Sequence, residues 1–303
     1  MSKLGVLFQN TANTMTWLDA WLPAPIQEQS YLGYLFLRLV DTIEDCANWP
    51  RANRIASLQQ LAALFQNPSV PAAQQLMASF PEPIVVNDAK LSALLTELPQ
   101  LISVLCAASP GVQQIICESC GTMIAGMIEF MGKAQAPWVL CLQNRTELQA
   151  YIYATAGMPI HMMTRLFILE YKIAEPQATY LLDHVAPYAN GIALADYFED
   201  LADDLAGGRR LFPPNMSQAE IVQLAQQGLK AGEAYTLALQ AAGIPDGVIA
   251  ICAGLIFIAQ HILAHVAQNG PGTRLERTQL AAIDTHLKAA IAHERPFFPM
   301  CGA

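Results

Sequence analysis

The sequence predicts an all-α protein, and three observations support this fold class. Apolar residues recur with helical spacing along almost the whole chain, and the alternating pattern of half-buried strands is nearly absent. Of the 303 residues, 53% are hydrophobic and only 14% are charged, which indicates a large apolar interior. Proline and glycine separate the periodic segments, and none of these breaks is long enough for a domain linker. We therefore expect one all-α domain over residues 1–303.

Each expected helix lies between breaks formed by proline, glycine or a capping residue. In chain order, the expected helices span Ala24–Cys46, Arg54–Phe65, Asp88–Ala107, Gly111–Met131, Thr146–Tyr171, Pro176–Leu205, Ser217–Ala242, Asp246–Gln268 and Arg277–His293. The breaks contain Pro50, the prolines between 68 and 71 and between 81 and 83, Pro110, Pro137, Pro213, Pro214, Pro245 and the glycines of 270–272. Asn144 is expected to cap the helix that follows it.

Charge and motif content exclude several functional classes. The net charge of −9 and the pI of about 5.1 argue against nucleic acid as a partner. The seven cysteines include one CxxC, Cys117 and Cys120, without a second pair at zinc spacing, so we expect buried thiols in a reducing compartment. His261 and His265 lack the glutamate that a metalloprotease helix needs, and the chain has no Walker or GxGxxG loop.

One stretch, Gly247–Ala267, has no charged residue and is long enough to span a membrane. Gln260, His261 and His265 lie in its second half, and no basic residues flank it, so we interpret it as a buried helix. The apolar run at the N-terminus is too short for a signal peptide. We therefore expect a cytoplasmic protein.

The densest acidic cluster lies in residues 191–214, GIALADYFEDLADDLAGGRRLFPP. On a helix, Asp196, Asp200 and Asp204 recur at i, i+4 and i+8, which stacks three carboxylates on one face. Like charges at this spacing destabilise a bare helix, and a bound cation would relieve the repulsion. Magnesium typically takes one or two carboxylates together with substrate phosphates, so this cluster is a candidate metal site.

Two arginines follow this acidic cluster in the sequence, after a pair of glycines. Gly207 and Gly208 are expected to end the helix. Arg209 and Arg210 come next, and their guanidinium groups could hold the phosphates of a metal-bound substrate.

A second acidic cluster lies far upstream in a strongly apolar segment. Asp41 and Asp45 are again four residues apart, and Arg38 and Tyr34 lie one and two turns before Asp41 on much the same side. A lone pair of this kind usually marks a solvated helix face. Two such pairs, each beside an arginine in an apolar helix, instead favour a site that binds metal and phosphate.

These motifs resemble those of the squalene/phytoene synthases, which join isoprenyl diphosphates head to head. Asp41-Thr-Ile-Glu-Asp45, with Arg38 before it, matches the first DxxxD motif of that family. Asp200-Leu-Ala-Asp-Asp204, followed by LAGGRRLFP, matches the second. A third family element, YxYxxAG followed by TRLF, is similar to residues 151–167. Within it, Tyr151 matches a family tyrosine near the diphosphate, and Tyr153 is a candidate for the substrate-facing wall.

The resemblance implies an isoprenoid-synthase-type helical bundle around a central cavity that both acidic helices face. It also implies that one farnesyl or geranylgeranyl diphosphate ionises and that its cation alkylates a second one, giving a cyclopropylcarbinyl diphosphate. Squalene synthases then use NADPH, for which this sequence gives no indication, whereas phytoene synthases eliminate a proton. The implied cofactor is Mg²⁺, with Asp41, Asp45, Asp196, Asp200 and Asp204 as ligands. Candidate substrate-binding residues are Thr14, Tyr34, Arg38, Tyr153, Asp196, Glu199 and Arg209.

The departures from the family pattern remove positive charge from the site. The family's Ser-Arg/Lys-Ser/Thr-Phe stretch near the N-terminus is Ala12-Asn13-Thr14-Met15 here. The family's asparagine and arginine before the second motif correspond to Asp196 and Glu199, and Ile160 replaces a glycine. We therefore hypothesise that one diphosphate subsite is weakened.

Two alternatives to head-to-head coupling stay open. One is chemistry on a single isoprenyl diphosphate, by cyclisation or by transfer to a non-isoprenoid acceptor. The other, from a different class, is a non-catalytic assembly factor of the same fold, against which the intact aspartate pairs argue. In either enzymatic case an apolar product would favour peripheral association with a membrane.

Overall fold

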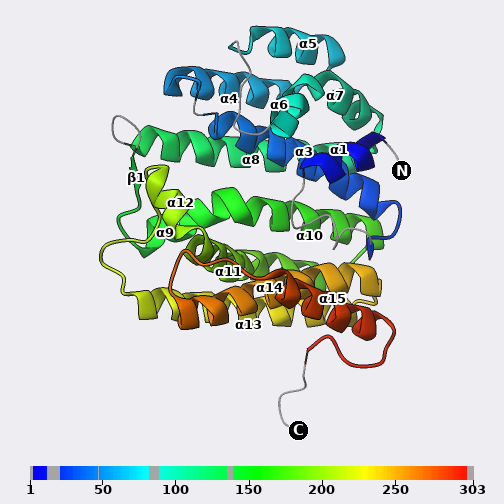
Figure 1. The fold of residues 1–303 in the computed structure, drawn as a ribbon. Coiled ribbons are helices and arrows are strands. Elements are labelled where there is room, and N and C mark those ends of the chain that lie inside the picture. Colours follow the sequence, from blue (N-terminus) through cyan, green and yellow to red (C-terminus); the bar gives the residue numbers. More distant parts are fainter. Residues whose placement is uncertain (1–2, 12–20, 47, 82–88, 135–138, 299–303) are drawn as a thin grey trace. The chain divides into compact units, whose positions relative to one another are not determined.

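The computed structural model describes residues 3–11, 21–46, 48–81, 89–134 and 139–298. Within these ranges the regular secondary structure is helical apart from one pair of two-residue strands, which confirms the predicted all-α class (Figure 1). Thr14 lies outside the described residues. The chain divides into two compact units, which we describe one at a time, and the expectation of one domain over 1–303 stays a prediction.

The first unit is built around helix α3. Its helices are α1 (Lys3–Thr11), α3 (Ile26–Glu44), α4 (Arg51–Gln66), α5 (Val70–Ser79), α6 (Ala89–Thr96), α7 (Leu98–Ala107), α8 (Pro110–Lys133) and, from His161 onward, α10 (Met158–Tyr171). α3 contacts α1, α4, α6, α7 and α8. Leu35, Phe36 and Leu39 of α3 are fully buried, as expected for a helix that is apolar on nearly every side.

The C-terminal end of α3 is fixed by polar contacts. Arg54 of α4 is buried, and its Nη1 donates a hydrogen bond to the carbonyl oxygen of Glu44 at 2.6 Å. This bond satisfies one of the carbonyl groups that a helix end leaves without an intrahelical partner. Thr42 donates its hydroxyl hydrogen to the Arg38 carbonyl at 2.7 Å. The first acidic motif therefore lies at a helix end that a neighbouring helix holds in place.

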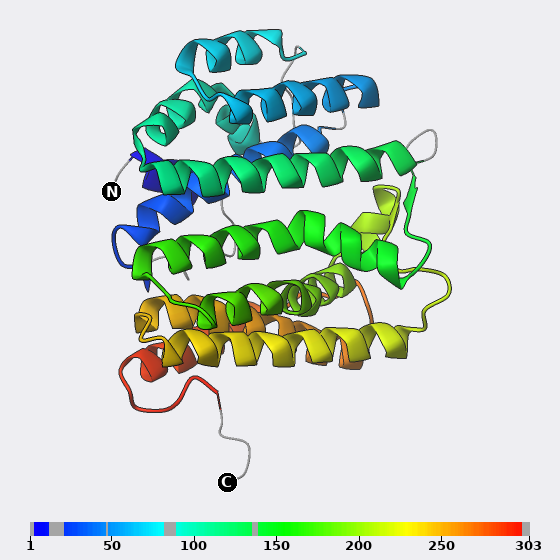
Figure 2. The same cartoon turned by 180° about the vertical axis from the view of Figure 1, so that it is seen from behind.

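The second unit contains the other helices and both strands. They are β1 (Leu140–Cys141), α9 (Arg145–Ile152), the π-helical segment η2 (Tyr153–Gly157), α11 (Gln177–Glu199), α12 (Leu201–Ala206), β2 (Arg209–Arg210), α13 (Gln218–Ala241), α14 (Asp246–Asn269) and α15 (Arg277–Ile291). α11, α13 and α14 pack on one another, and α15 packs on α14 (Figure 2). The first three residues of α10 also belong to this unit.

α11 and α13 approach so closely that their backbones touch. A Cβ atom placed on Gly228 of α13 would lie 2.4 Å from the backbone nitrogen of Gly191 and 2.5 Å from the carbonyl oxygen of Pro187, both on α11. A Cβ on Gly191 would lie 2.5 Å from the backbone nitrogen of Leu229. Because no real Cβ fits at such distances, only glycine permits this crossing. The crossing sets where the acidic C-terminal end of α11 lies.

Two of the expected helices are divided in the structure. Asp88–Ala107 is replaced, in its described part, by α6 and α7, and Pro176–Leu205 by α11 and α12. The expected helix Thr146–Tyr171 is present without a break, with the π-helical segment η2 between α9 and α10. The first division occurs just before Pro99, which lies in the first turn of α7. Proline there has no amide hydrogen to donate to the preceding turn, so the helix starts anew.

Two helices, α1 and α5, were not predicted. In α5 the prolines interpreted as a break open a helix instead. The side chain of Ser69 accepts a hydrogen bond from the backbone nitrogen of Ala72, and Pro71 occupies the first turn. Proline is tolerated at that position because its missing N–H would have no helical partner. The predicted cap at Asn144 is confirmed, since its side chain accepts from the Glu147 backbone nitrogen at 3.0 Å.

In the described part of the chain, α8 and α14 are long and apolar enough to cross a membrane, judged by length and composition. In the most apolar window of each helix, 50% of α8 and 61% of α14 are buried inside the structure. The core helix of a soluble protein has the same properties, so these helices are weak evidence for membrane association.

The CxxC pair lies on α8 as free thiols, as expected. Burial raises the pKa of the half-buried Cys117 to about 11 and that of the buried Cys120 well above its ordinary value. Burial likewise raises the pKa of Cys252 on α14 to about 12. Thiolate is the reactive form, so these thiols are nearly inert at neutral pH.

Among the cysteines that the structure describes, we expect a thiol-alkylating reagent at pH 8 to label the exposed Cys106 first. Labelling of Cys120 and Cys252 should be at least about 100-fold slower, because both the thiolate fraction and the access are reduced. Timed alkylation followed by peptide mass spectrometry measures these rates. Denaturant should equalise the rates, and rapid labelling of Cys120 or Cys252 in the native protein would contradict this packing.

Candidate active site

The first acidic motif places an arginine, a carboxylate and a phenol together in the first unit. Arg38 forms an ion pair with Asp41 one turn later on α3, and both side chains are half-buried. Burial raises the pKa of the Tyr34 phenol, while the charge of Arg38 lowers it and that of Asp41 raises it, so Tyr34 lies within reach of both charges. Asp45 follows the helix end with an exposed side chain, and its N–H donates to the Asp41 carbonyl at 2.9 Å.

One N–H donor of the Arg38 guanidinium has no hydrogen-bond partner among the described residues. This donor is the buried Nε atom. A buried donor in this state costs about 1–3 kcal/mol. An arginine with one carboxylate partner and such an orphaned donor is a suitable group to gain a further anionic ligand.

The second acidic motif bends where a continuous helix was expected. α11 ends at Glu199 and α12 begins at Leu201, so the prediction of one helix through Leu205 is wrong. The bend falls where a straight helix would stack like charges, which disfavours continuation. The backbone nitrogens of Asp200 and Asp204 still donate to the carbonyls of Asp196 and Asp200, each at 2.9 Å. The i, i+4 register of the three aspartates therefore persists through the bend.

The three aspartates differ in exposure. Asp204 is buried, the side chain of Asp200 is 40% exposed, and Asp196 is open to solvent. Although solvent reaches Asp196, the surrounding protein and then the charges of Asp200, Glu199 and Asp204 raise the pKa of its carboxyl to about 7. Negative charge is therefore concentrated at this site beyond what its arginines neutralise.

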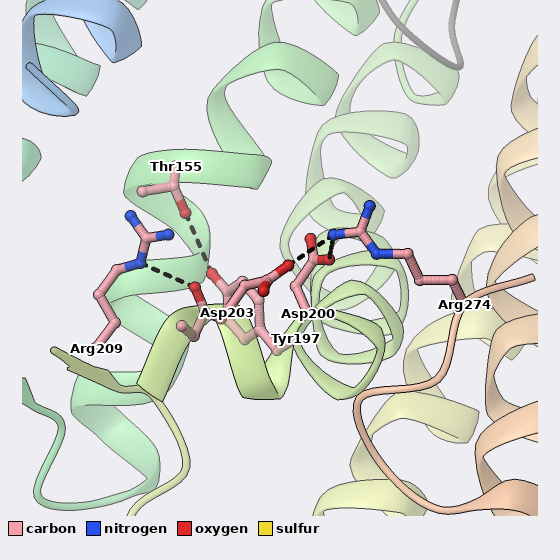
Figure 3. Close-up of polar contacts among 7 residues, drawn as sticks. Thr155, Tyr197, Asp200, Asp203, Arg209 and Arg274 are labelled. Carbon is pink, nitrogen blue, oxygen red and sulfur yellow. Dashed lines mark hydrogen bonds and ion pairs between the residues drawn. The ribbon is translucent and has the colours of Figure 1, made fainter. Parts of the chain in front are cut away.

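Two arginines from different segments contact this motif (Figure 3). The Nε atom of Arg209 donates to Oδ1 of Asp204 at 2.9 Å. The Nη2 atom of Arg274, from the segment between α14 and α15, donates to Oδ1 of Asp200 at 2.9 Å and to Oδ2 of Asp203 at 2.8 Å. Of the two arginines that the sequence analysis named beside this motif, Arg209 contacts it, and Arg274, which the sequence analysis did not identify, is the second contact.

A short parallel strand pair holds Arg209 in place. The backbone nitrogen of Leu140 donates to the Gly208 carbonyl at 2.9 Å, and that of Leu142 donates to the Arg210 carbonyl at 3.1 Å. Gly208 has φ of +80°, a conformation that favours glycine. The two glycines therefore end α12 and also turn the chain into a strand that carries Arg209 back to Asp204.

Side chains of α9 and η2 contact Tyr197 of α11, which lies beside the second motif. The rings of Tyr151 and Tyr197 are 6.3 Å apart. The hydroxyl oxygens of Thr155 and Tyr197 are 3.4 Å apart (Figure 3). Burial raises the pKa of the Tyr197 phenol well above its ordinary value, so it stays protonated. Tyr153 opens η2, a π-helical segment of a kind often found at functional sites. Tyr151 is thus placed in the same unit as Asp200 and Asp204.

Glu199 turns toward a neighbouring segment. Its Oε1 atom accepts a hydrogen bond from the backbone nitrogen of Leu275 at 2.8 Å. Leu275 directly follows Arg274, so Glu199, for which the resemblance implies an arginine, contacts the segment that delivers another arginine. Sequence reasoning missed Arg274 because no spacing links it to residues 196–204. Tyr197 was also missed, although its position beside Asp196 is a signal that could have identified it.

The donor chemistry of the site fits magnesium. In the part of the chain that the structure describes, no group of three or more His, Cys, Asp or Glu side chains is arranged to hold a metal unaided. Mg²⁺ is commonly bound through one or two carboxylates, substrate phosphates and water, so it needs no such protein cage. The oxygen donors at Asp41 and Asp45, and at Asp200 and Asp204, are of the hard type that this ion takes.

Comparisons with known proteins agree with the motifs. A family model described as squalene/phytoene synthase matches residues 12–284. Botryococcus squalene synthase, from Botryococcus braunii, is 24% identical over 220 residues, covering 69% of this chain and 41% of that protein. The chain thus spans less than half the length of this curated relative.

Solved structures share the fold. The complex of TcSQS with the ligand BPH1237 has a TM-score of 0.76 at 15% identity, covering 94% of this chain and 85% of the other. A dehydrosqualene synthase in complex with a ligand has a TM-score of 0.57 at 15% identity, covering 96% and 95%. The predicted isoprenoid-synthase-type helical fold is confirmed by this likeness.

Proposed function

Because this chain belongs to the squalene/phytoene synthase family, we propose that it is a prenyltransferase that couples two isoprenyl diphosphates head to head. The observation that carries the proposal is the pairing of both DxxxD motifs with arginines. Arg38 is paired with Asp41, Arg209 with Asp204, and Arg274 with Asp200. Carboxylates and guanidinium groups held together in this way can receive a metal-bound diphosphate.

We propose that both acidic motifs take part in binding the diphosphate of the substrate. Asp41, Asp45, Asp200 and Asp204 would hold Mg²⁺, with Asp196 as a further ligand. When bound, the metal neutralises charge on the departing diphosphate. Arg38 and Arg209 are proposed to contribute fixed positive charge to diphosphate oxygens.

In the proposed reaction, the carbon–oxygen bond of one substrate breaks and its electron pair leaves with the diphosphate. The allylic cation is then attacked by the double bond of the second substrate, and ring closure to the cyclopropane releases a proton. Tyr151 and Tyr153 are proposed to line the path of this cation. Aromatic faces attract cations, and an apolar wall excludes the water that would quench them.

A second candidate is chemistry on a single isoprenyl diphosphate. It is favoured by Asp196 and Glu199, which stand where the family has asparagine and arginine. The surrounding protein and then the charges of Asp200, Glu199 and Asp204 raise the pKa of the Asp196 carboxyl to about 7, so negative charge is in excess there. A second diphosphate would bind less readily to such a surface. An apolar product of either reaction would favour peripheral membrane association.

Product analysis distinguishes these functions. The protein is incubated with farnesyl or geranylgeranyl diphosphate, with and without Mg²⁺ and NADPH, and the products are identified by mass spectrometry. We expect a Mg²⁺-dependent product that contains the carbon skeletons of two substrates. Single-skeleton products alone would favour the second candidate, and the absence of diphosphate release would favour a non-catalytic role.

A further inference from the structure

The segment 270–276, which we call the strap, runs from the end of α14 to α15 across the end of α11. The backbone nitrogen of Gly272 donates to the Phe198 carbonyl at 2.8 Å. The backbone nitrogen of Leu275 donates to Oε1 of Glu199 at 2.8 Å. Phe198 and Glu199, the last two residues of α11, therefore hold the strap at Gly272 and at Leu275.

Arg274 lies between these two anchors. Its Nη2 atom reaches both Asp200 and Asp203 (Figure 3). A guanidinium has five N–H donors, and Nη2 supplies only two of them. Within the described residues, the Nη1 and Nε groups of Arg274 donate to no side chain or carbonyl, and 67% of the side chain is exposed. Arg274 can therefore bind an anion without releasing its carboxylates.

We propose that Glu199 is a positioning residue that holds the strap through Leu275, so that Arg274 supplies the diphosphate-binding cation of the second acidic motif. The proposal deepens the proposed function and rests on it. The family has an arginine at the position of Glu199, on the acidic helix itself. In this chain the same position carries an acceptor, and the cation comes from the strap instead. The loss of positive charge inferred from the sequence is thus offset by a residue 75 positions further along.

The chemistry of the Glu199 contact permits a sharp test. Glu199→Gln keeps a side-chain oxygen that can accept the Leu275 N–H, whereas Glu199→Ala removes the acceptor. Arg274→Ala removes the cation, and the double variant removes both. Arg277→Ala is the matched control, because Arg277 is also exposed and lies three residues further along, at the start of α15.

The first measurement is amide hydrogen exchange of the strap in the metal-free protein. We expect Glu199→Ala to speed exchange at residues 270–276 about tenfold or more, because one of the two backbone anchors is lost. Glu199→Gln should stay within about threefold of the wild type. Unchanged exchange in Glu199→Ala, with the fold intact by circular dichroism, would overturn the positioning role.

The second measurement is calorimetric binding of inorganic pyrophosphate in the presence of Mg²⁺. We expect Arg274→Ala and Glu199→Ala each to weaken binding about tenfold, since a charge-assisted contact to phosphate is lost. The double variant should bind no more weakly than the worse single variant, because both changes act through the same guanidinium. A roughly 100-fold loss in the double variant would show that the two residues act independently and would overturn the coupling.

The outcomes separate this proposal from the proposed function. Arg277→Ala should bind pyrophosphate as the wild type does, and an equal loss there would mean that Arg274 contributes only general surface charge. If the wild type bound no pyrophosphate, the proposed function would fail together with the role of Arg274. Hydrogen exchange would still decide by itself whether Glu199 holds the strap. Wild-type binding combined with unchanged affinity in Arg274→Ala would overturn this inference alone.

Discussion

Asp200→Asn should lower the turnover of isoprenyl diphosphate by about 100-fold or more, with the fold retained. Removing one group that stabilises developing charge typically costs about 100- to 1000-fold, and removing one that orients a metal ligand about 10- to 100-fold. The substituted amide would keep the size of the side chain and one acceptor oxygen, but not the negative charge that a metal ligand needs. Steady-state release of diphosphate measures the effect, and helical circular dichroism checks the fold.

Asp203→Asn is the matched control for this change. Asp203 lies in the same bend, is exposed, and accepts from the same Arg274 nitrogen at 2.8 Å, but it is not part of the DxxxD pair. We expect a loss of no more than about fivefold, because exposed ion pairs contribute little. Equal losses in both variants would mean that only the ion pair with Arg274 matters, and not a metal-binding role for Asp200.

The free energy of unfolding of Asp200→Asn should differ from that of the wild type by less than about 1 kcal/mol. Loss of the ion pair with Arg274 destabilises the folded state slightly, and relief of repulsion from neighbouring carboxylates stabilises it by a similar amount. A large drop in melting temperature would mean that the loss of turnover reflects unfolding.

The first motif should respond in the same way. Asp41→Asn removes the partner of Arg38, and we again expect about a 100-fold loss or more in turnover. Glu28→Gln, at the opposite end of α3, should have no measurable effect. Loss of activity in both Asp41→Asn and Asp200→Asn would support joint action by the two motifs, whereas full activity in Asp41→Asn would contradict it.

The sequence predicted the parts of this site whose evidence is local. The i, i+4 spacing of the aspartates, the adjacent Arg38 and the glycines after α12 are short-range signals, and each is found in the structure. Helical periodicity likewise gave the fold class, because it depends on residues only three or four apart. These features needed no knowledge of how the helices pack.

The features of the site that could not be predicted from the sequence depend on tertiary contacts. The bend at Asp200 arises in a stretch whose pattern is helical throughout, so periodicity alone could not reveal it. Arg274 reaches the motif because the strap crosses the end of α11, a contact between segments 74 residues apart. By sequence alone, Glu199 brings negative charge toward a diphosphate, whereas in the structure its side chain accepts a hydrogen bond from a backbone N–H. Its role could be assigned only after that partner was known.

The glycine crossing of α11 and α13 leads to the largest expected effect on stability. Gly228→Ala should lower the free energy of unfolding by about 3 kcal/mol or more. The added Cβ would lie 2.4 Å from the Gly191 nitrogen and 2.5 Å from the Pro187 oxygen. These are backbone atoms of another helix, so no side chain can move aside. The overlap is relieved only if α11 shifts relative to α13, which would weaken their packing.

Gly121→Ala provides the matched control, with the same chemical change inside a helix. A Cβ on Gly121 of α8 would meet no atom within 4 Å. Alanine is favoured over glycine in a helix by about 0.5–1 kcal/mol, so this variant should be slightly more stable than the wild type. Denaturant unfolding followed by circular dichroism measures both. A Gly228→Ala variant as stable as Gly121→Ala would mean that the two backbones are not in contact. Because α11 carries Asp196 and ends beside Asp200, folded Gly228→Ala should also lose turnover, in proportion to how far the shifted helix displaces these carboxylates.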